Sequence, residues 1–201
     1  MHETAEAAGR MLMVHQQLRW YPMHHHARRL IVEGAIGQVR RIDFTMSVHS
    51  DVCLRGYRSQ LPHLIFQDLA IHHLDLVRYL AGQECQSIYA RDWPSVETGL
   101  DITAATDACA VLEMTGPVTA CYTSSIRRLM DHVGYACSAR VSGSEGELLL
   151  GDDRLVLQTR AGYAAQAKPR AIVPEPPAVD TWAAFAQAIE TRAPTLTCSA
   201  D

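Results

Sequence analysis

The 201-residue sequence lacks any apolar run of about 20 residues, the length that a membrane-spanning helix requires. Its first residues are acidic and show no signal-peptide pattern. Six cysteines are present, but none forms a Cys-x-x-Cys pair, and a chain of this length does not depend on disulfides. These absences argue against a membrane protein and against a disulfide-stabilised secreted domain, and they predict a cytoplasmic location.

Positive charge is not in excess either, because 18 Lys and Arg residues stand against 22 Asp and Glu residues, for a formal net charge of -4. The basic residues are scattered along the chain. We therefore expect no nucleic-acid partner. With 48% hydrophobic and 20% charged residues, the composition is that of a globular protein with one sizeable core.

Hydrophobic periodicity predicts helices and a larger number of strands. Pro22 opens a helix whose apolar residues recur at helical spacing up to Gly34. Apolar and polar residues alternate from Ile42 to Val48, which predicts a half-buried strand. Further predicted elements are a buried strand at 11–14, a hairpin around 115–117, strands at 139–142, 146–150 and 154–159, and a helix at 181–191 with Trp182, Phe185, Ala186 and Ile189 on its inner face. Strands that follow one another without helices favour an α+β fold, a large mixed or mostly antiparallel sheet with helices packed on one face.

The segment 68–80 predicts a helix that is apolar nearly all round except for one ionisable stripe. On a helical wheel, Asp68, His72, Asp75 and Tyr79 fall inside an arc of roughly 60°. Such a helix is usually buried, and buried charge without a partner is costly. The stripe therefore either satisfies itself or lines a site where chemistry takes place.

Two other interpretations of these polar residues stay open. Asp68 could serve only to favour the start of the helix. The stripe could hold a divalent metal ion, although no second cluster of ligands is evident, so no metal site is predicted. Consecutive histidines at 24–26 fan out by about 100° each on a helix and would not converge on one ion.

Four motifs follow one another along the chain. They are the stretch Arg19-Trp-Tyr-Pro22 after a short strand, the segment Gly34-Ala-Ile-Gly37-Gln-Val, the helix Asp68-x-x-x-His72-x-x-Asp75 followed by Gly82, and the turn Gly143-Ser-Glu-Gly146. In this order and spacing they resemble the C-terminal, substrate-binding and oligomerisation domain of the glucose–fructose oxidoreductase, inositol dehydrogenase and MocA (Gfo/Idh/MocA) family. The resemblance covers nearly the whole chain.

The sequence departs from that family by what it does not contain. Family members begin with a Rossmann domain that carries a glycine-rich phosphate turn and a Glu-Lys-Pro motif, and this sequence has neither. By the resemblance, residues 1–20 are a remnant of the end of a dinucleotide-binding domain. Residues 21–201 form the substrate-binding and oligomerisation domain, truncated at its C-terminus. We therefore expect the chain alone to bind no NAD or NADP and to be inactive.

The resemblance implies an oxidoreductase that moves a hydride between NAD or NADP and a sugar, polyol or related hydroxy compound. His72 would be the base that takes the hydroxyl proton, and Asp68 would orient its ring from one turn earlier. Asp75 would hold structure through Arg78 or a backbone group. The other site residues predicted by position are Arg19 for the cofactor and Tyr21, Arg55 and Arg58 for the substrate. The open face of the sheet would join two copies into a homo-oligomer.

Two other functions remain as alternatives. A stand-alone, non-enzymatic binding or assembly module derived from this family would keep the sheet face but would not need His72. A metal-dependent hydrolase or lyase would use the acidic stripe and would lose its metal when His72 is replaced.

Overall fold

The computed structural model describes residues 1–94, 103–130, 132–151 and 154–193. Along the chain the elements are α1 (His2–Ala7), η1 (Gln17–Trp20), α2 (Pro22–Val32), β1 (Val39–Ser47), η2 (Val52–Leu54), η3 (Gly56–Gln60), η4 (Ile65–Leu69), α3 (Ala70–Ala81), β2 (Cys85–Trp93), β3 (Asp107–Met114), β4 (Thr119–Ser125), β5 (Val133–Gly143), β6 (Gly146–Gly151), β7 (Arg154–Thr159), α4 (Arg160–Ala164), β8 (Arg170–Ile172) and α5 (Thr181–Thr191). The η elements are short 3-10 helices, except η4, which is a single π-helical turn. Within these ranges no helix has the length and apolar character needed to cross a membrane.

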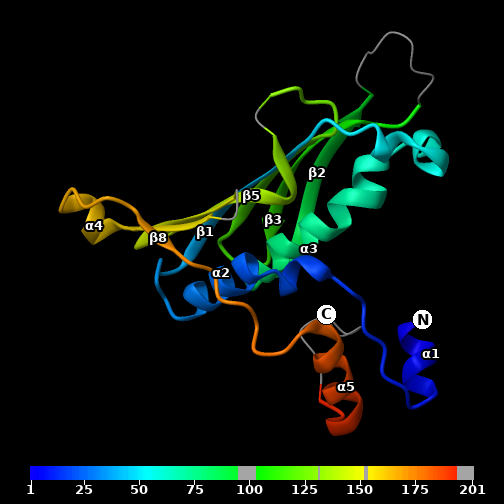
Figure 1. Ribbon diagram of the computed structural model, residues 1–201, viewed down its shortest axis with the longest axis horizontal. Coiled ribbons are helices and arrows are strands. Elements are labelled where there is room, and N and C mark those ends of the chain that lie inside the picture. The colour runs from blue at the N-terminus through cyan, green and yellow to red at the C-terminus, as the bar shows by residue number, and fades with distance from the viewer. Residues whose placement is uncertain (95–102, 131, 152–153, 194–201) are drawn as a thin grey trace.

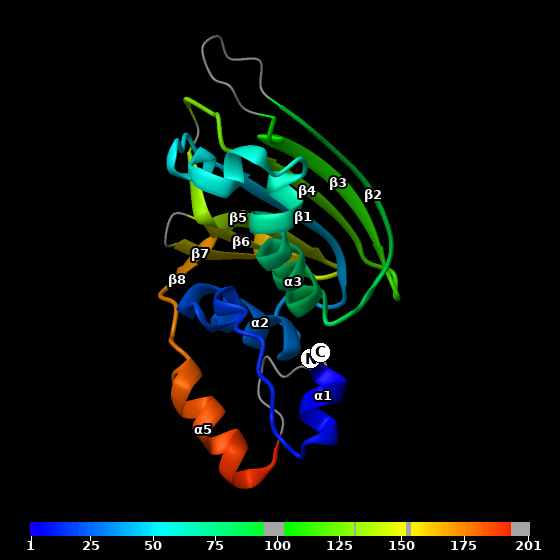
Figure 2. The same cartoon turned by 90° about the vertical axis from the view of Figure 1, so that its right-hand side faces the viewer.

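One eight-stranded sheet forms the body of the molecule, in the order β2-β3-β4-β1-β5-β6-β7-β8 (Figure 1). Strands β1 and β4 are parallel, and the other neighbouring strands are antiparallel. Helices α2 and α3 lie against the same face of this curved sheet (Figure 2). The predicted fold class, an α+β fold with a mostly antiparallel mixed sheet and helices on one face, is confirmed.

The strand register sorts apolar residues to the helical side of the sheet. Paired neighbours across five strands form one buried row, Leu112, Ala120, Ile42, Val141 and Leu148. Because side chains alternate along a strand, the row one residue away points to the opposite face. That row is partly polar and exposed, which fits a sheet with one covered face.

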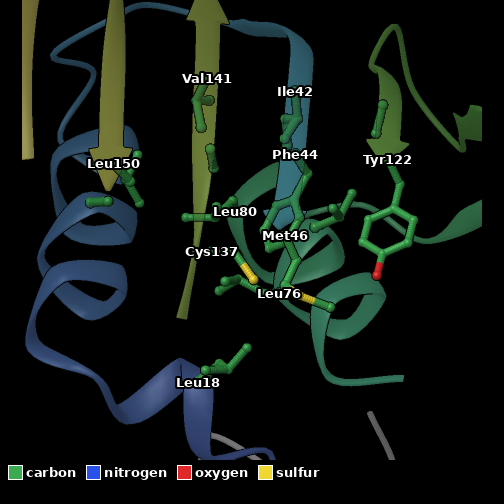
Figure 3. Packing of buried hydrophobic residues seen from close by; sticks show 14 of the residues in the cluster. Leu18, Ile42, Phe44, Met46, Leu76, Leu80, Tyr122, Cys137, Val141 and Leu150 are labelled. Carbon is green, nitrogen blue, oxygen red and sulfur yellow. The ribbon is translucent and has the colours of Figure 1, made fainter. Parts of the chain in front are cut away.

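The core lies between the sheet and α3. Leu76 and Leu80 of α3 pack toward Phe44 and Met46 of β1, and Leu18 closes the cluster from below in the view (Figure 3). All five side chains are essentially inaccessible to solvent. Burial of each is worth about 1.5–3 kcal/mol, so this layer fixes the position of α3 on the sheet.

Two predicted helix boundaries are confirmed with their local causes. Helix α2 begins with Pro22 at its first position, where a missing N–H costs nothing. Helix α3 ends before Gly82, whose φ of 65° lies in the left-handed region that favours glycine. The end of α3 is therefore set by sequence.

Two predictions about packing are wrong. Residues 11–14 form no named strand, and Met11, Leu12 and Met13 are only half-buried. In α5, Trp182 and Ile189 are 70% and 49% exposed. Helix α5 stands apart from the sheet in both views (Figures 1 and 2), and its contacts are with the N-terminal segment, where the Trp182 ring stacks on His15 with centroids 5.9 Å apart. The pattern of α5 predicted the helix but not what covers it.

Candidate active site

The polar stripe begins on the π-turn η4 and continues on α3, rather than on one regular helix. In a π-turn the hydrogen bonds join residues five apart, so a spacing of four no longer returns to the same side. Asp68 lies on η4 and His72 on α3, with the irregular residue Leu69 between them (φ −112°, ψ −52°). The two side chains therefore leave the helix in different directions from those expected of a regular helix.

Asp68 does not orient His72 by a hydrogen bond, which corrects the sequence prediction. Its carboxylate accepts from the Arg58 guanidinium at 2.8 and 3.3 Å and from the Tyr57 hydroxyl at 3.2 Å. Arg58 and Asp68 were both predicted for the site, and the structure brings them together as an ion pair. Asp68 acts on His72 only through its charge, which favours the protonated imidazole.

His72 is instead held by Gln16, a residue that the sequence reasoning did not select. Its Nδ1 lies 2.8 Å from Oε1 of Gln16, and the ring is half-buried. Burial is the main cause that lowers the pKa of His72 below 6.5, with His15 acting in the same direction and the carboxylates of Asp68 and Asp75 opposing it. At neutral pH the imidazole is therefore uncharged, as a base must be before it accepts a proton.

Tyr135 of β5 is the second group that sequence reasoning missed. Its ring meets the His72 ring edge to face, with centroids 6.0 Å apart, and its hydroxyl accepts a hydrogen bond from Nε2 of Gln17 at 3.2 Å. Burial raises the pKa of Tyr135 to about 12. The adjacent pair Gln16-Gln17, directly before Leu18 and Arg19, was the available signal, but its partners lie more than fifty residues away.

Arg19 and Asp75 form a buried structural pair beside this group. Two hydrogen bonds of 2.8 and 2.7 Å join the guanidinium to both carboxylate oxygens, and both side chains are over 90% buried. Arg78 adds a 3.4 Å contact to Asp75, as predicted, and Arg19 also lies over the Tyr79 ring. The pair fastens η1 to α3, so it places Gln16 against His72. The predicted cofactor contact of Arg19 stays a prediction.

The remaining predicted substrate residues lie in different surroundings. Tyr21 is 39% exposed, stacks on His24 and is one of the lesser causes of the raised pKa of Tyr135, so it lies at the edge of the group. Arg55 is exposed, and its positive charge helps to lower the pKa of Asp51. The structure therefore brings Tyr21 close to the site and leaves Arg55 outside the contacts around His72.

Neighbouring histidines have structural partners. His73 is fully buried, donates from Nε2 to the Tyr135 carbonyl and accepts at Nδ1 from the Tyr122 hydroxyl. His24 contacts the Leu18 carbonyl, whereas His26 contacts the backbone N–H of Glu175. Over the described ranges, no group of three or more His, Cys, Asp or Glu residues is arranged to hold a metal ion.

A hollow of about 930 Å³ lies away from this group, between α4 and the outer side of strands β5 to β7. Its lining includes Arg140, Leu149, Val156 and Tyr163, and none of the predicted site residues. The candidate site is the group of contacts around His72 and not this hollow, because the ionisable and hydrogen-bonding side chains predicted for catalysis gather around His72.

The fold is shared with several oxidoreductases of known structure. An oxidoreductase from Agrobacterium radiobacter, in complex with NAD+, L-tartaric acid and magnesium, superposes with a TM-score of 0.83 at 21% identity over 99% of this chain and 60% of its own. The aldose-aldose oxidoreductase from Caulobacter crescentus, complexed with glycerol, gives 0.78 at 19% identity over 99% and 59%. An inositol dehydrogenase homologue from Azotobacter vinelandii, complexed with NADH and myo-inositol, gives 0.68 at 18% over 85% and 44%.

Sequence comparison gives the same relationship. A D-apiose dehydrogenase from Paraburkholderia graminis is 36% identical over 84 residues, 41% of this chain and 22% of that protein. An uncharacterised protein from Sinorhizobium fredii is 29% identical over 126 residues, 61% of this chain and 34% of that protein. The chain thus spans about a fifth to a third of these relatives. The model of the GFO/IDH/MocA C-terminal domain matches residues 24–149, more than half of the chain, and the chain therefore belongs to the GFO/IDH/MocA family.

Proposed function

We propose that the chain is the substrate-binding and oligomerisation part of an NAD(P)-dependent oxidoreductase that acts on a sugar, polyol or related hydroxy compound. The observation that carries this proposal is the state of His72, a half-buried, neutral imidazole held at Nδ1 by Gln16. Family membership and the names of the relatives, which act on or bind apiose, glycerol or inositol, support the substrate class.

His72 would serve as the base. Oxidation of a carbinol needs a group that takes the hydroxyl proton while the hydrogen on carbon leaves with its electron pair. An imidazole suits this task because its pKa lies close to working pH, and Nε2 of His72 has no partner among the described residues. Arg58, held by Asp68, and Tyr21 at the edge of the group would bind further hydroxyls of the substrate.

The nucleotide would not be held by the described residues alone. None of the helices α2, α3 and α5 begins after a glycine-rich turn, which is the usual cradle for a pyrophosphate. When bound, NAD(P) accepts the hydride from the carbinol carbon. The chain by itself is therefore proposed to bind substrate without turning it over.

We further propose that a nucleotide-binding domain packs against residues 1–20 and α5. Large apolar side chains are exposed there, among them Val14, Trp182 and Ile189. The NAD+ complex from Agrobacterium radiobacter covers 99% of this chain with 60% of its own length, so it contains a further portion of comparable size. Residues 1–20 would then be the end of that domain, and 21–201 the substrate domain.

The test is to express the chain in one polypeptide with the nucleotide-binding portion of a D-apiose dehydrogenase and follow the absorbance of reduced nicotinamide with a panel of sugars and polyols. His72→Gln should lower kcat by about 10²- to 10⁴-fold. His63→Gln is the matched control, because His63 is exposed and pairs with Asp92 on β2.

Equal rates in the parent and in His72→Gln would refute the base. Binding of polyols by the chain, with no turnover in the joined polypeptide and no effect of His72→Gln, would favour the alternative, a non-enzymatic binding or assembly module. Stoichiometric zinc or manganese that is lost in His72→Gln would favour the metal-dependent alternative.

A further inference from the structure

We propose that Tyr135 donates a hydrogen bond to the substrate oxygen whose proton His72 takes, and that Gln16 and Gln17 fix the direction of the two hydrogen bonds. This inference rests on the proposed function and adds three residues to it. It makes Tyr135 a catalytic residue and the two glutamines positioning residues.

Gln16 determines which nitrogen of His72 is the base. A neutral imidazole carries one hydrogen, on either Nδ1 or Nε2. The amide oxygen of Gln16, 2.8 Å from Nδ1, can only accept, so the hydrogen must be on Nδ1. Nε2 then keeps its lone pair, and no described residue donates a hydrogen bond to it.

Gln17 determines the direction of the Tyr135 hydroxyl. The amide Nε2 of Gln17 can only donate, so the Tyr135 oxygen accepts that bond at 3.2 Å. The hydroxyl hydrogen is then left to donate elsewhere, and within the described parts of the chain it meets no acceptor. With a pKa of about 12, Tyr135 keeps this hydrogen at neutral pH.

The two rings that carry these groups are in contact, and the groups have opposite polarity. Their rings meet edge to face, with centroids 6.0 Å apart and an interplanar angle of 73°. An acceptor on one ring and a donor on the adjacent ring match an alcohol, because its O–H donates to Nε2 while its lone pairs accept from the Tyr135 hydroxyl.

His72 and Tyr135 can keep these positions throughout the reaction. The O–H bond breaks and its proton moves to Nε2, while the C–H bond breaks and its hydrogen leaves as hydride for NAD(P). The electron pair of the O–H bond becomes the second bond of the carbonyl. Tyr135 donates to the oxygen throughout, and it stabilises the negative charge that builds up there during the reaction.

The two adjacent glutamines reach different elements because η1 begins between them. Gln16 precedes η1, with φ −89° and ψ 81°, and Gln17 is its first residue. Gln16 reaches α3 and Gln17 reaches β5. The buried pair of Arg19 and Asp75 keeps η1 in the place that both bonds require.

Nitrogen NMR of the His72 ring tests the positioning role without any activity. We expect a protonated Nδ1 and an unprotonated Nε2 in the parent chain, and loss of that preference in Gln16→Leu. Gln17→Leu, which leaves Gln16 in place, is the matched control. A protonated Nε2 in the parent chain, or an unchanged ring in Gln16→Leu, would overturn the role of Gln16.

Kinetics of the joined polypeptide test the donor. Tyr135→Phe and Gln17→Leu should both lower kcat, the former by about 10²- to 10³-fold, with little change of KM. Tyr163→Phe is the control, because Tyr163 is exposed on α4. An unchanged kcat in Tyr135→Phe, with His72→Gln inactive, would overturn the donor and leave the base intact. An unchanged kcat in both would refute the proposed function itself.

Discussion

Replacing Asp75 by asparagine would leave the guanidinium of Arg19 buried without its carboxylate. The two side chains are 7% and 9% exposed and share two hydrogen bonds of 2.8 and 2.7 Å. Asparagine has nearly the same shape but no charge, and its amide nitrogen would face a donor. Removal of one partner of a buried ion pair costs about 3–5 kcal/mol, because the other charge stays desolvated.

An exposed pair of similar geometry provides the control. Arg41 also bonds both carboxylate oxygens of Asp43, at 2.6 to 2.9 Å, but these side chains are 59% and 37% exposed. Water solvates either partner when the other is removed, so Asp43→Asn should cost about 0–1 kcal/mol. The two substitutions differ in burial and not in chemistry.

The assay is urea unfolding of the chain, followed by circular dichroism. A loss of about 4 kcal/mol is a large part of the 5–15 kcal/mol typical of a domain and would move the midpoint by more than about 1 M. The double variant Arg19→Met with Asp75→Leu should recover most of the loss, because no charge is then left buried. If Asp75→Asn costs no more than Asp43→Asn, the buried pair does not fasten η1 to α3.

Two further predictions concern pH and self-association. Burial lowers the pKa of His73 from 6.5 to about 4, so the unfolded state binds the proton first, and stability should fall by up to about 3 kcal/mol as the pH drops through this window. His73→Gln should reduce the slope of unfolding free energy against pH between 4 and 6.5. The slope should not vanish, because the pKa values of His24, His25 and His72 are lowered too. An unchanged slope would contradict the prediction. A second copy should dock on the outer face of the sheet, which is the face turned away from α2 and α3. Leu149→Lys should therefore shift the mass measured by light scattering toward the monomer, whereas Val32→Lys, at an exposed position of α2, should not. A parent chain that is monomeric at all concentrations would refute this docking.

The outer face of the sheet is the surface on which that prediction depends. Leu149 pairs with Val156 in β7 and with Arg140 in β5, and Arg140 pairs with Asp43 in β1. Apolar side chains and both signs of charge therefore share one row. A second copy turned by a two-fold axis could match such a row to itself.

Most of the regular elements could be predicted from local pattern. The alternation around Ile42 and the turn at Gly116 predicted β1, β3 and β4, and Pro22 and Gly82 fixed two helix ends. These signals are local, because they depend on the period of a strand or helix and on the backbone freedom of single residues. The family motifs pointed to Asp68 and His72 as site residues, but they did not identify the side chains that these two residues contact.

The failures lie where an irregular turn or a contact with another element, and not the period of the sequence, decides where a side chain points. A regular wheel placed Asp68 over His72, but the π-turn at 65–69 gave Asp68 to Arg58. Gln16 and Tyr135 showed no periodic signal, because their function comes from partners on other elements.

By itself, the sequence determined the fold class, most of the strands and helices in their order along the chain, and the resemblance to an oxidoreductase family. Those properties follow from periodicity and from motif order, which do not require distant residues to be placed. Only the tertiary structure decided that Gln16 holds His72, that Arg19 belongs to Asp75, and that Tyr135 faces the imidazole. These pairings depend on the packing of η1, α3 and β5 around one core, which no local pattern encodes.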